Sequence, residues 1–285
     1  MLVPTQDPDA WDVFDYLTDH THTPVPDTTW HTALRHAVDP DELMTLGFHA
    51  HDDAPIIAES VYRRAADAAH IGAMVNLGLL LADAGRGEEA ESFYRQAADA
   101  GDTDAMVNLG VLLADAGRGE EAESFYRQAA DAGHSGAMVN LGNLLADAGR
   151  GEEAESFYRQ AADAGHSDAM FNLGNLLARA GRAEEAESFY RQAADAGHID
   201  AMFNLGNLLA DAGRGEEAES FYRQAADAGH SDAVVNLGLL LADAARGDEA
   251  DDSPVRSLAP STATPGLTVH TRLGSTTHGR EGSGH

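Results

Sequence analysis

The sequence predicts an all-α fold, a solenoid built from helix-turn-helix repeats of 32 residues. One observation behind this prediction is a string that occurs five times without change, EEAESFYRQAADAG, beginning at residues 88, 120, 152, 184 and 216. A second is the triplet Asn-Leu-Gly, which recurs six times at the same 32-residue spacing. A fixed period of this size is typical of stacked arrays in which each unit contacts only its neighbours.

The first helix of each repeat, called helix A, is predicted by apolar residues at helical spacing. In the last full repeat these residues are Met202, Leu205 and Leu209. Gly206 lies on the same stripe, where a glycine costs about 1 kcal/mol relative to alanine. We expect it to admit the close approach of Ala218 from the second helix. Helix A is expected at about 71–84, 103–116, 135–148, 167–180, 199–212 and 231–245.

The second helix of each repeat, called helix B, has an apolar face that includes Ala218, Phe221 and Tyr222. Glu219 and Arg223 are four residues apart, a spacing that allows an ion pair on the outer face. A glycine follows each helix and fits the left-handed conformation that commonly ends one. Helix B is expected at about 87–100, 119–132, 151–164, 183–196 and 215–228.

Residues 1–40 are expected to form an N-terminal helical cap. One short helix is predicted at about residues 8–19 and another after Asp27. Their aromatic residues, Trp11 and Trp30, have two interpretations. They cover the first stacking interface, because terminal repeats need a modified face, or they form a separate recognition motif.

Residues 41–70 are a degenerate first repeat. Asp39 and Pro40 form a typical helix start, with an aspartate cap followed by proline in the first turn. The segment 58–70 is a degenerate copy of helix B, with the sequence AESVYRRAADAAH. The repeat array therefore extends over residues 41–247, and its five full repeats occupy 71–230.

The pattern fails at the C-terminal end, in a truncated last repeat at 231–252. Ala245 replaces the helix-ending glycine, and a short helix B is expected to begin at Asp248 and to stop before Pro254, since proline is unfavourable inside a helix. The tail 253–285 has no aromatic residue and is predicted to be disordered. The last helix A thus lacks its partner, which indicates either a docking surface or a truncated gene.

The composition excludes several classes of site. The chain has no cysteine, so disulfides, thiolate metal sites and cysteine nucleophiles are excluded. No long apolar run or secretory signal is recognisable, so we expect a cytoplasmic protein with no membrane segment. The formal net charge of −30 disfavours nucleic acid and favours basic partners. The same charge also has a simpler interpretation, which is the solubility of a long exposed array.

The repeated residues resemble a known family. The residue types and their spacing within one repeat are similar to those of the tetratricopeptide repeat. The turn sequence Ala-Asp-Ala-Gly-His looks like that of the related Sel-one-like repeat. The resemblance covers about residues 41–247 and implies a non-catalytic α-solenoid. It also implies that helix A lines a concave groove that holds a peptide. The matching residues are Met202, Leu205, Gly206, Leu209, Ala218, Tyr222 and Ala225.

The candidate binding residues lie on the face of helix A opposite its apolar stripe. Asparagine there can bond a ligand backbone through both its donor and its acceptor. An equally weighted interpretation is that these asparagines order the stack by bonding to neighbouring helices. The candidates are Asn76, Asn108, Asn140, Asn172, Asn204 and Asn236, with Asn143, Asn175, Asn207, Phe171 and Phe203.

This face varies between repeats, whereas helix B does not. Leu79 and Val111 stand where later repeats have asparagine, and Arg179 replaces an aspartate. We therefore expect a scaffold or adaptor whose acidic groove binds a protein or peptide with basic and apolar residues. The alternative is a nucleic-acid mimic, or a regulator of a basic DNA-binding protein, whose acid rows would make binding steeply salt-dependent.

No catalytic, metal or cofactor site is predicted. The chain has no nucleophile elbow, phosphate loop or zinc-protease motif. An enzyme site within the N-terminal 40 residues is a remote alternative. The histidine that ends each repeat cannot converge on one ion, because packed helices are about 8–10 Å apart and metal–imidazole bonds about 2 Å long. These histidines are His70, His134, His166, His198 and His230.

Overall fold

The computed structural model describes residues 27–37, 39–51 and 54–251, which form helices and turns with no strand among them. The predicted helix at 8–19, Trp11 and the tail 253–285 lie outside the described residues. The helices are α2 (Asp27–His36), α3 (Pro40–Ala50), α4 (Pro55–Asp67), α5 (Ile71–Asp83), α6 (Gly87–Asp99), α7 (Thr103–Asp115), α8 (Gly119–Asp131), α9 (Ser135–Asp147), α10 (Gly151–Asp163), α11 (Ser167–Arg179), α12 (Ala183–Asp195), α13 (Ile199–Asp211), α14 (Gly215–Asp227) and α15 (Ser231–Asp251).

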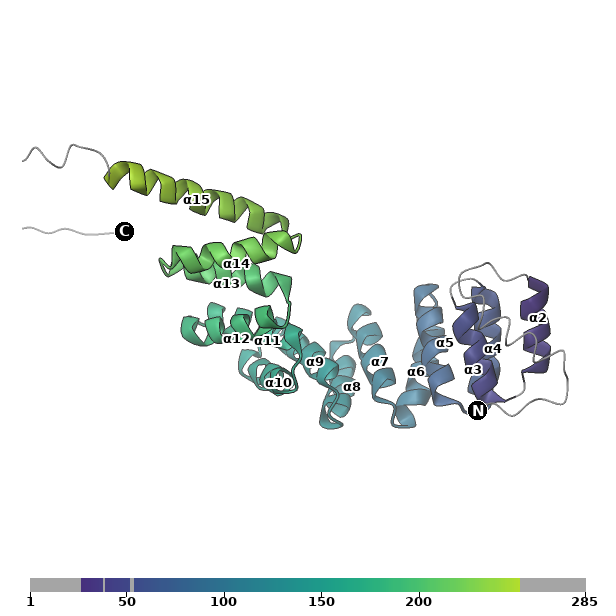
Figure 1. Ribbon diagram of the computed structural model, residues 1–285. Helices are drawn as coiled ribbons and strands as arrows, with labels where there is room; N and C mark the ends of the chain where they lie inside the picture. Colours follow the sequence, from purple (N-terminus) through teal and green to yellow (C-terminus); the bar gives the residue numbers. More distant parts are fainter. Residues whose placement is uncertain (1–26, 38, 52–53, 252–285) are drawn as a thin grey trace, which may run out of the picture. The chain divides into compact units, whose positions relative to one another are not determined.

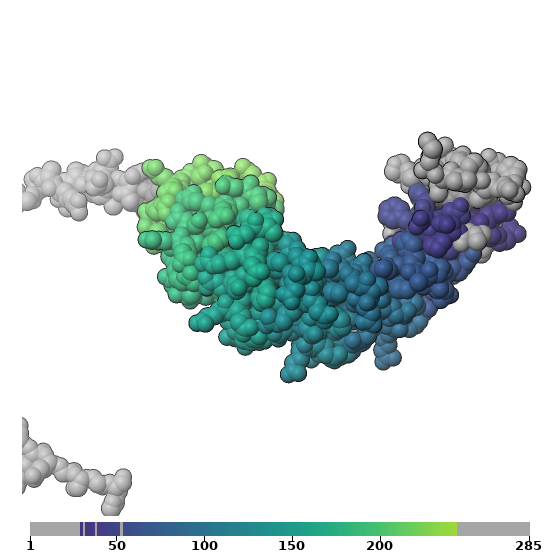
Figure 2. Space-filling view, turned by 90° about the horizontal axis from the view of Figure 1, so that it is seen from below, coloured from purple at the N-terminus to yellow at the C-terminus, as the bar shows by residue number. Residues whose placement is uncertain are grey.

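The helices pack in chain order as pairs (Figure 1). Each odd-numbered helix from α5 to α13 is a helix A and packs against the helix B that follows it, and each helix B from α4 to α12 then packs against the next helix A. Figure 2 shows the same succession in space-filling form, with each repeat touching the next. The chain divides into two compact units, Met1–Gly238 and Leu239–His285. The predicted α-solenoid of tetratricopeptide-like repeats is confirmed.

Glycines with positive φ end the helices, as the sequence predicts. Gly213 has φ +73° and Gly229 has φ +95°. In the first of these turns the Arg214 amide donates to the Leu209 carbonyl at 2.8 Å, which satisfies a carbonyl left open at the helix end. Ala69 makes the same turn with φ +62° and is the one non-glycine residue in the left-handed region within the described ranges.

The core between helices A and B depends on a contact between a glycine and a tyrosine. An ideal Cβ placed on Gly206 would lie 2.6 Å from the Tyr222 ring, so only glycine leaves room for that ring. Leu205, Leu209 and Ala218 are fully buried beside it. The expectation that Gly206 admits Ala218 was therefore wrong in its partner, because the ring one turn further along helix B occupies the gap.

The N-terminal helix α2 packs against α3 and α4. Its Trp30 is 1% exposed. Arg64 of α4 donates to the carbonyl oxygens of Leu34 at 2.6 Å and Ala37 at 2.8 Å, which bonds the end of α2 to the first repeat. Asp39 caps α3 by accepting the Asp41 amide at 2.9 Å.

The last repeat differs from the prediction. A helix A to residue 245 and a separate short helix B from Asp248 are expected, whereas the structure has one continuous helix, α15, from Ser231 to Asp251. Ala245 explains the difference, because it replaces the left-handed glycine that ends helix A in the other repeats. Helix A therefore continues through the place where the chain would turn.

Candidate functional site

The candidate binding surface is called here the helix-A face. It consists of the fifth, sixth and ninth residues of each helix A, of which Val139 in α9 is itself buried. The sixth residue is an asparagine from α5 to α15, and the ninth changes along the array. This change divides the face into two halves with different hydrogen bonding.

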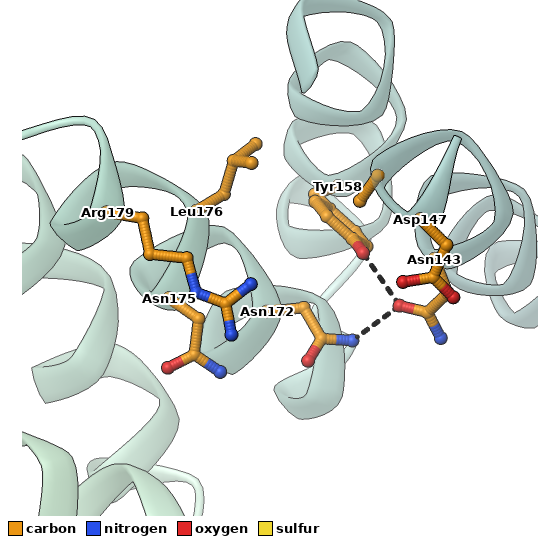
Figure 3. A pocket seen from close by; sticks show the side chains of 8 residues that line it. Asn143, Asp147, Tyr158, Asn172, Asn175, Leu176 and Arg179 are labelled. Atoms are coloured by element: carbon orange, nitrogen blue, oxygen red, sulfur yellow. Dashed lines mark hydrogen bonds between the residues drawn. The ribbon is translucent and has the colours of Figure 1, made fainter. Parts of the chain in front are cut away.

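In the C-terminal half the asparagines bond to one another (Figure 3). The Oδ1 atom of Asn143 accepts from the Tyr158 hydroxyl at 2.7 Å and from Nδ2 of Asn172 at 2.9 Å. Each set thus joins the two helices of one repeat to helix A of the next. Two further sets repeat this geometry, Asn175 with Tyr190 and Asn204, and Asn207 with Tyr222 and Asn236.

In the N-terminal half this bonding is absent. Leu79 and Val111 occupy the ninth position and accept no hydrogen bond. Within the described residues the side chains of Asn76, Asn108 and Asn140 make no hydrogen bond, and the same holds for the hydroxyls of two buried tyrosines, Tyr94 and Tyr126. His166 Nδ1 is the one fully enclosed side-chain polar atom without a partner in the described part of the chain. The open amides and hydroxyls of these five residues therefore reach the surface.

The two halves also differ in exposed apolar area. Leu79 is 39% exposed and Val111 is 42% exposed, and Phe48, the ninth residue of α3, is 75% exposed. Phe171 and Phe203 in the other half are partly buried instead. Their rings stack on His198 and His230, with centroids 4.4 Å and 4.3 Å apart.

An open pocket of about 310 Å³ lies on the helix-A face between α9, α10 and α11 (Figure 3). Arg179 lines it, in the position where α5, α7, α9 and α13 end in aspartate. Asp147 lies in the same pocket, together with Asn143 and Asn175. Within the described residues Arg179 makes no ion pair, so this pocket combines an open guanidinium with an open carboxylate.

Four of the repeat-ending histidines, His70, His134, His198 and His230, cap helix A through Nδ1, whereas His166 makes no such hydrogen bond. In His198, Nδ1 accepts the Ala201 amide at 3.2 Å and Nε2 lies 3.4 Å from Asp168 of the preceding repeat. The aspartate-capped α7 uses Asp102 in the same way. Over the described ranges no group of three or more histidine, aspartate or glutamate residues could hold a metal ion. Nor does any helix of those ranges have the length and apolar character to cross a membrane.

Helix B carries a second repeated set of side chains, of which the sequence predicts only the ion pair of Glu219 with Arg223. Glu187, Arg191, Arg214 and Glu217 form a closed charge ring, in which Arg191 donates to both glutamates and Arg214 does the same at 2.7–2.8 Å. Four equivalent charge rings precede it. They are Glu59, Arg63, Arg86 and Glu89; Glu91, Arg95, Arg118 and Glu121; Glu123, Arg127, Arg150 and Glu153; and Glu155, Arg159, Arg182 and Glu185.

The charge rings pair glutamates with arginines and so do not contribute to the net negative charge of the chain. Hydrogen bonds from Arg86 and Arg63 lower the pKa of the Glu89 carboxyl to about 2, so this group stays ionised and paired at neutral pH. Arg63 also lies over the Phe93 ring, 5.5 Å from its centroid. Because each charge ring is neutral, the excess negative charge lies elsewhere, including the aspartates Asp83 and Asp115 at the ends of α5 and α7.

The comparisons with known proteins agree with this geometry. Sequence profiles described as tetratricopeptide repeat match residues 71–100, 103–132, 139–199 and 177–237. No curated protein sequence matches the chain.

Several solved structures share the fold. One is c5321, a protective antigen of uropathogenic Escherichia coli displaying an SLR fold, with 24% identity, TM-score 0.63, 81% of this chain covered and 56% of that one. The present chain thus spans little more than half of that protein. A Sel1 repeat protein from Oxalobacter formigenes has 26% identity and TM-score 0.56, covering 77% of this chain and 97% of that one. Pseudomonas aeruginosa pilF has 18% identity and TM-score 0.58, and the match covers 72% of this chain and 97% of that one.

Proposed function

The chain belongs to the tetratricopeptide-repeat family, whose arrays are commonly non-catalytic scaffolds for protein interactions, and we propose that it binds a segment of another protein along the helix-A face. The observation that carries the proposal is the difference between the two halves of that face. In the N-terminal half, asparagine amides and tyrosine hydroxyls are open beside exposed apolar side chains.

The binding mode follows from that arrangement. Asn76, Asn108 and Asn140 each present a donor and an acceptor, which suits the peptide bonds of an extended chain. Leu79 and Val111 lie between them and can bury apolar side chains of the ligand. The ligand is therefore a segment with apolar anchors, held by its backbone over three successive repeats.

Charge adds a preference for basic residues in the ligand. Asp83 and Asp115 are exposed at the ends of α5 and α7. No arginine neutralises them in an ion pair within the described residues, because the nearby arginines belong to the charge rings of helix B. Lysine or arginine beside the apolar anchors would thus gain binding energy and association rate at low salt.

The test is selection of short peptides from a displayed random library by the full chain. The selected peptides should be enriched in basic and apolar residues. The double variant Asn76→Ala and Asn108→Ala should bind them about 25-fold more weakly, since each lost hydrogen bond costs about 1 kcal/mol. A matched control, Ser92→Ala with Ser124→Ala on the exposed side of helix B, should bind them unchanged.

Two results would contradict the proposal. One is equal binding of the selected peptides by the asparagine variant and the chain itself. The other is binding that collapses steeply with salt and does not depend on the apolar anchors, which is the behaviour of a nucleic-acid mimic.

A further inference from the structure

In the C-terminal half of the helix-A face, a tyrosine hydroxyl and an asparagine amide donate to the same oxygen atom (Figure 3). Tyr158 and Asn172 donate to Oδ1 of Asn143 at 2.7 Å and 2.9 Å. The oxygens of Asn175 and Asn207 each accept from an equivalent pair at 2.8–2.9 Å. A carbonyl oxygen has two lone pairs and satisfies both donors at once. The array itself therefore shows which group fits between such a pair of donors.

Two equivalent pairs of donors occur in the N-terminal half, where the ninth residue of helix A is apolar and offers no oxygen. The tyrosine rings are placed alike, because an ideal Cβ on Gly78, Gly110 or Gly142 would lie 2.7 Å from Cδ1 of the facing ring. Within the described residues the side chains of these two pairs make no hydrogen bond. The pairs, called here the open donor pairs, are Tyr94 with Asn108, where Leu79 replaces the asparagine, and Tyr126 with Asn140, where Val111 replaces it.

The surroundings of the open donor pairs favour an uncharged oxygen. Burial, and after it the negative charge of Asp83, raises the pKa of Tyr94 to about 12, so the hydroxyl keeps its proton at neutral pH. Burial and the charge of Asp115 do the same for Tyr126. Each pair thus offers two donors close to a carboxylate, which repels an anionic oxygen. A neutral carbonyl, such as that of a peptide bond, is the group that fits.

The spacing of the two pairs restricts the conformation of the ligand. They lie one repeat apart, and α5 packs directly against α7, as helices about 8–10 Å apart do. In a polyproline II helix the carbonyls on one side recur every three residues, or about 9 Å. In a β-strand they recur every two residues, or about 7 Å, and an α-helix uses its carbonyls in its own hydrogen bonds. Among these conformations, polyproline II matches the array.

Building on the proposed function, we infer that the bound segment is a proline-containing, basic polyproline II helix, in which every third carbonyl accepts from an open donor pair. The same threefold repeat brings one apolar side chain to Leu79 and the next to Val111, both exposed. Basic side chains beside them face Asp83 and Asp115. Proline suits such a segment because it fixes φ and has no N–H that needs an acceptor. The segment ends towards Asn143, whose oxygen already occupies the next pair of donors.

The test measures the fluorescence anisotropy of a labelled peptide made of four Leu-Pro-Arg units, titrated with the full chain. A peptide of the same composition, reordered so that the three-residue period is lost, controls for charge attraction. The periodic peptide should bind at least fivefold more tightly. Equal binding of the two peptides, or no saturable binding of the periodic one, would overturn the inference. The proposed function fails separately, on library-selected peptides that bind the asparagine variant and the chain equally.

A pair of tyrosine variants tests the donors themselves. Tyr94→Phe with Tyr126→Phe removes one donor from each open donor pair and breaks no hydrogen bond within the described array. It should weaken binding of the periodic peptide roughly tenfold at an unchanged melting temperature. The matched control, Tyr190→Phe with Tyr222→Phe, removes hydroxyls that are already bonded within the stack and should leave the affinity for the peptide unchanged.

A substitution that supplies the oxygen from within the array gives an independent test. Val111→Asn should occupy Tyr126 and Asn140 in the way that Asn143 occupies its own neighbours, and it should weaken binding of the periodic peptide at least fivefold. Val111→Leu keeps an apolar side chain there and should preserve the affinity. Peptide binding that is unchanged by Val111→Asn, or by the double tyrosine variant, would refute the assignment of the open donor pairs.

Discussion

The side-chain oxygen of Asn143 accepts hydrogen bonds from Tyr158 at 2.7 Å and from Asn172 at 2.9 Å, so one atom connects three helices across a repeat boundary. Val111 is the equivalent residue one repeat earlier and cannot make either bond. Stability and ligand access therefore depend on the same position. An asparagine there accepts hydrogen bonds from the tyrosine and the asparagine of the neighbouring helices, whereas an apolar residue leaves those two donors available to a ligand.

Substitutions of Val111 and Asn143 should change the stability of the array in opposite directions. Val111→Asn supplies an acceptor for Tyr126 and Asn140, and two hydrogen bonds of about 0.5–1.5 kcal/mol each should raise the urea midpoint by the equivalent of about 1 kcal/mol. Asn143→Val should lower it by a similar or larger amount. The control Val111→Leu reproduces Leu79 and should be neutral. A Val111→Asn variant less stable than Val111→Leu would contradict the prediction.

Two glycines at the same place in helix A should respond in opposite ways to alanine. Gly206→Ala forces the Tyr222 ring to move, which should cost about 1–3 kcal/mol. Gly238→Ala meets no described atom within 4 Å other than its chain neighbours and the backbone of its own helix, and it should gain up to about 1 kcal/mol from helix propensity. Unfolding in urea, followed by circular dichroism, checks both. Destabilisation by both substitutions would contradict the prediction, because it would show that both glycines are closely packed.

The left-handed alanine in the first repeat is a site where stability can be raised. Ala69 has φ +62°, a conformation that costs an L-residue roughly 1–2 kcal/mol. Ala69→Gly removes that cost, partly offset by the greater freedom of glycine in the unfolded chain, so the gain should be about 1 kcal/mol. The reverse change at Gly85, which has φ +73°, should destabilise the array. Thermal unfolding of both variants is the measurement.

The charge rings should make the array sensitive to acid. The pKa of Glu121 falls from 4.5 to about 2 because Arg118 and Arg95 donate to its carboxylate. A lowered folded-state pKa gives stabilisation that is complete above about pH 4.5 and is lost as the pH falls towards 2. Relief of self-repulsion acts in the opposite direction as the acidic groups are neutralised.

The melting temperature should therefore decline between pH 4.5 and 2, after any rise at higher pH. An Arg118→Gln variant, which opens one charge ring, should show a lower melting temperature at pH 7 and a smaller decline in acid. Identical pH profiles for the variant and the chain would show that the charge rings do not cause the decline.

Arg179 should set a local preference for an acidic residue in the bound segment. It is an open guanidinium in the pocket between α9 and α11, flanked by aspartates at the equivalent ends of α9 and α13. Arg179→Asp restores the charge of the other repeats and should weaken binding of a selected acidic-residue peptide about fivefold to tenfold, as for loss of one charged hydrogen bond. Asp211→Arg is the matched control, and it should create a second preference one repeat further on.

Much of the fold follows from sequence patterns. In the five full repeats the predicted ends of helices A and B lie within one residue of the observed ends, because the apolar spacing and the terminal glycines indicate the same boundaries. The last helix A, expected to end at residue 245, continues to Asp251. The partner of Gly206 was not predictable in the same way. Ala218 and Tyr222 lie one turn apart on one helix face, and periodicity does not specify which of them is opposite the glycine.

The roles of the asparagines were less predictable still. Whether Asn172 is bonded or open depends on residue 143, which belongs to the neighbouring repeat, and on the reach of Tyr158. For Asn140 the residue equivalent to Asn143 is Val111, which has no side-chain oxygen to accept its amide. The difference between Val111 and Asn143 is visible in the sequence. It shows which asparagines are bonded only when the positions of the neighbouring helices are known.

Each charge ring takes half of its members from one repeat and half from the next, so no repeat can complete one alone. The electrostatic contribution of these rings therefore increases with the number of junctions rather than with the number of modules. Deleting an internal module removes two junctions and creates one, and the charge ring at the new junction has the same four residue types, because the copies of helix B and the arginine before it are the same. Arrays of different length made from this unit should consequently assemble in the same register, and module number becomes a means of setting the length of the surface available to a ligand.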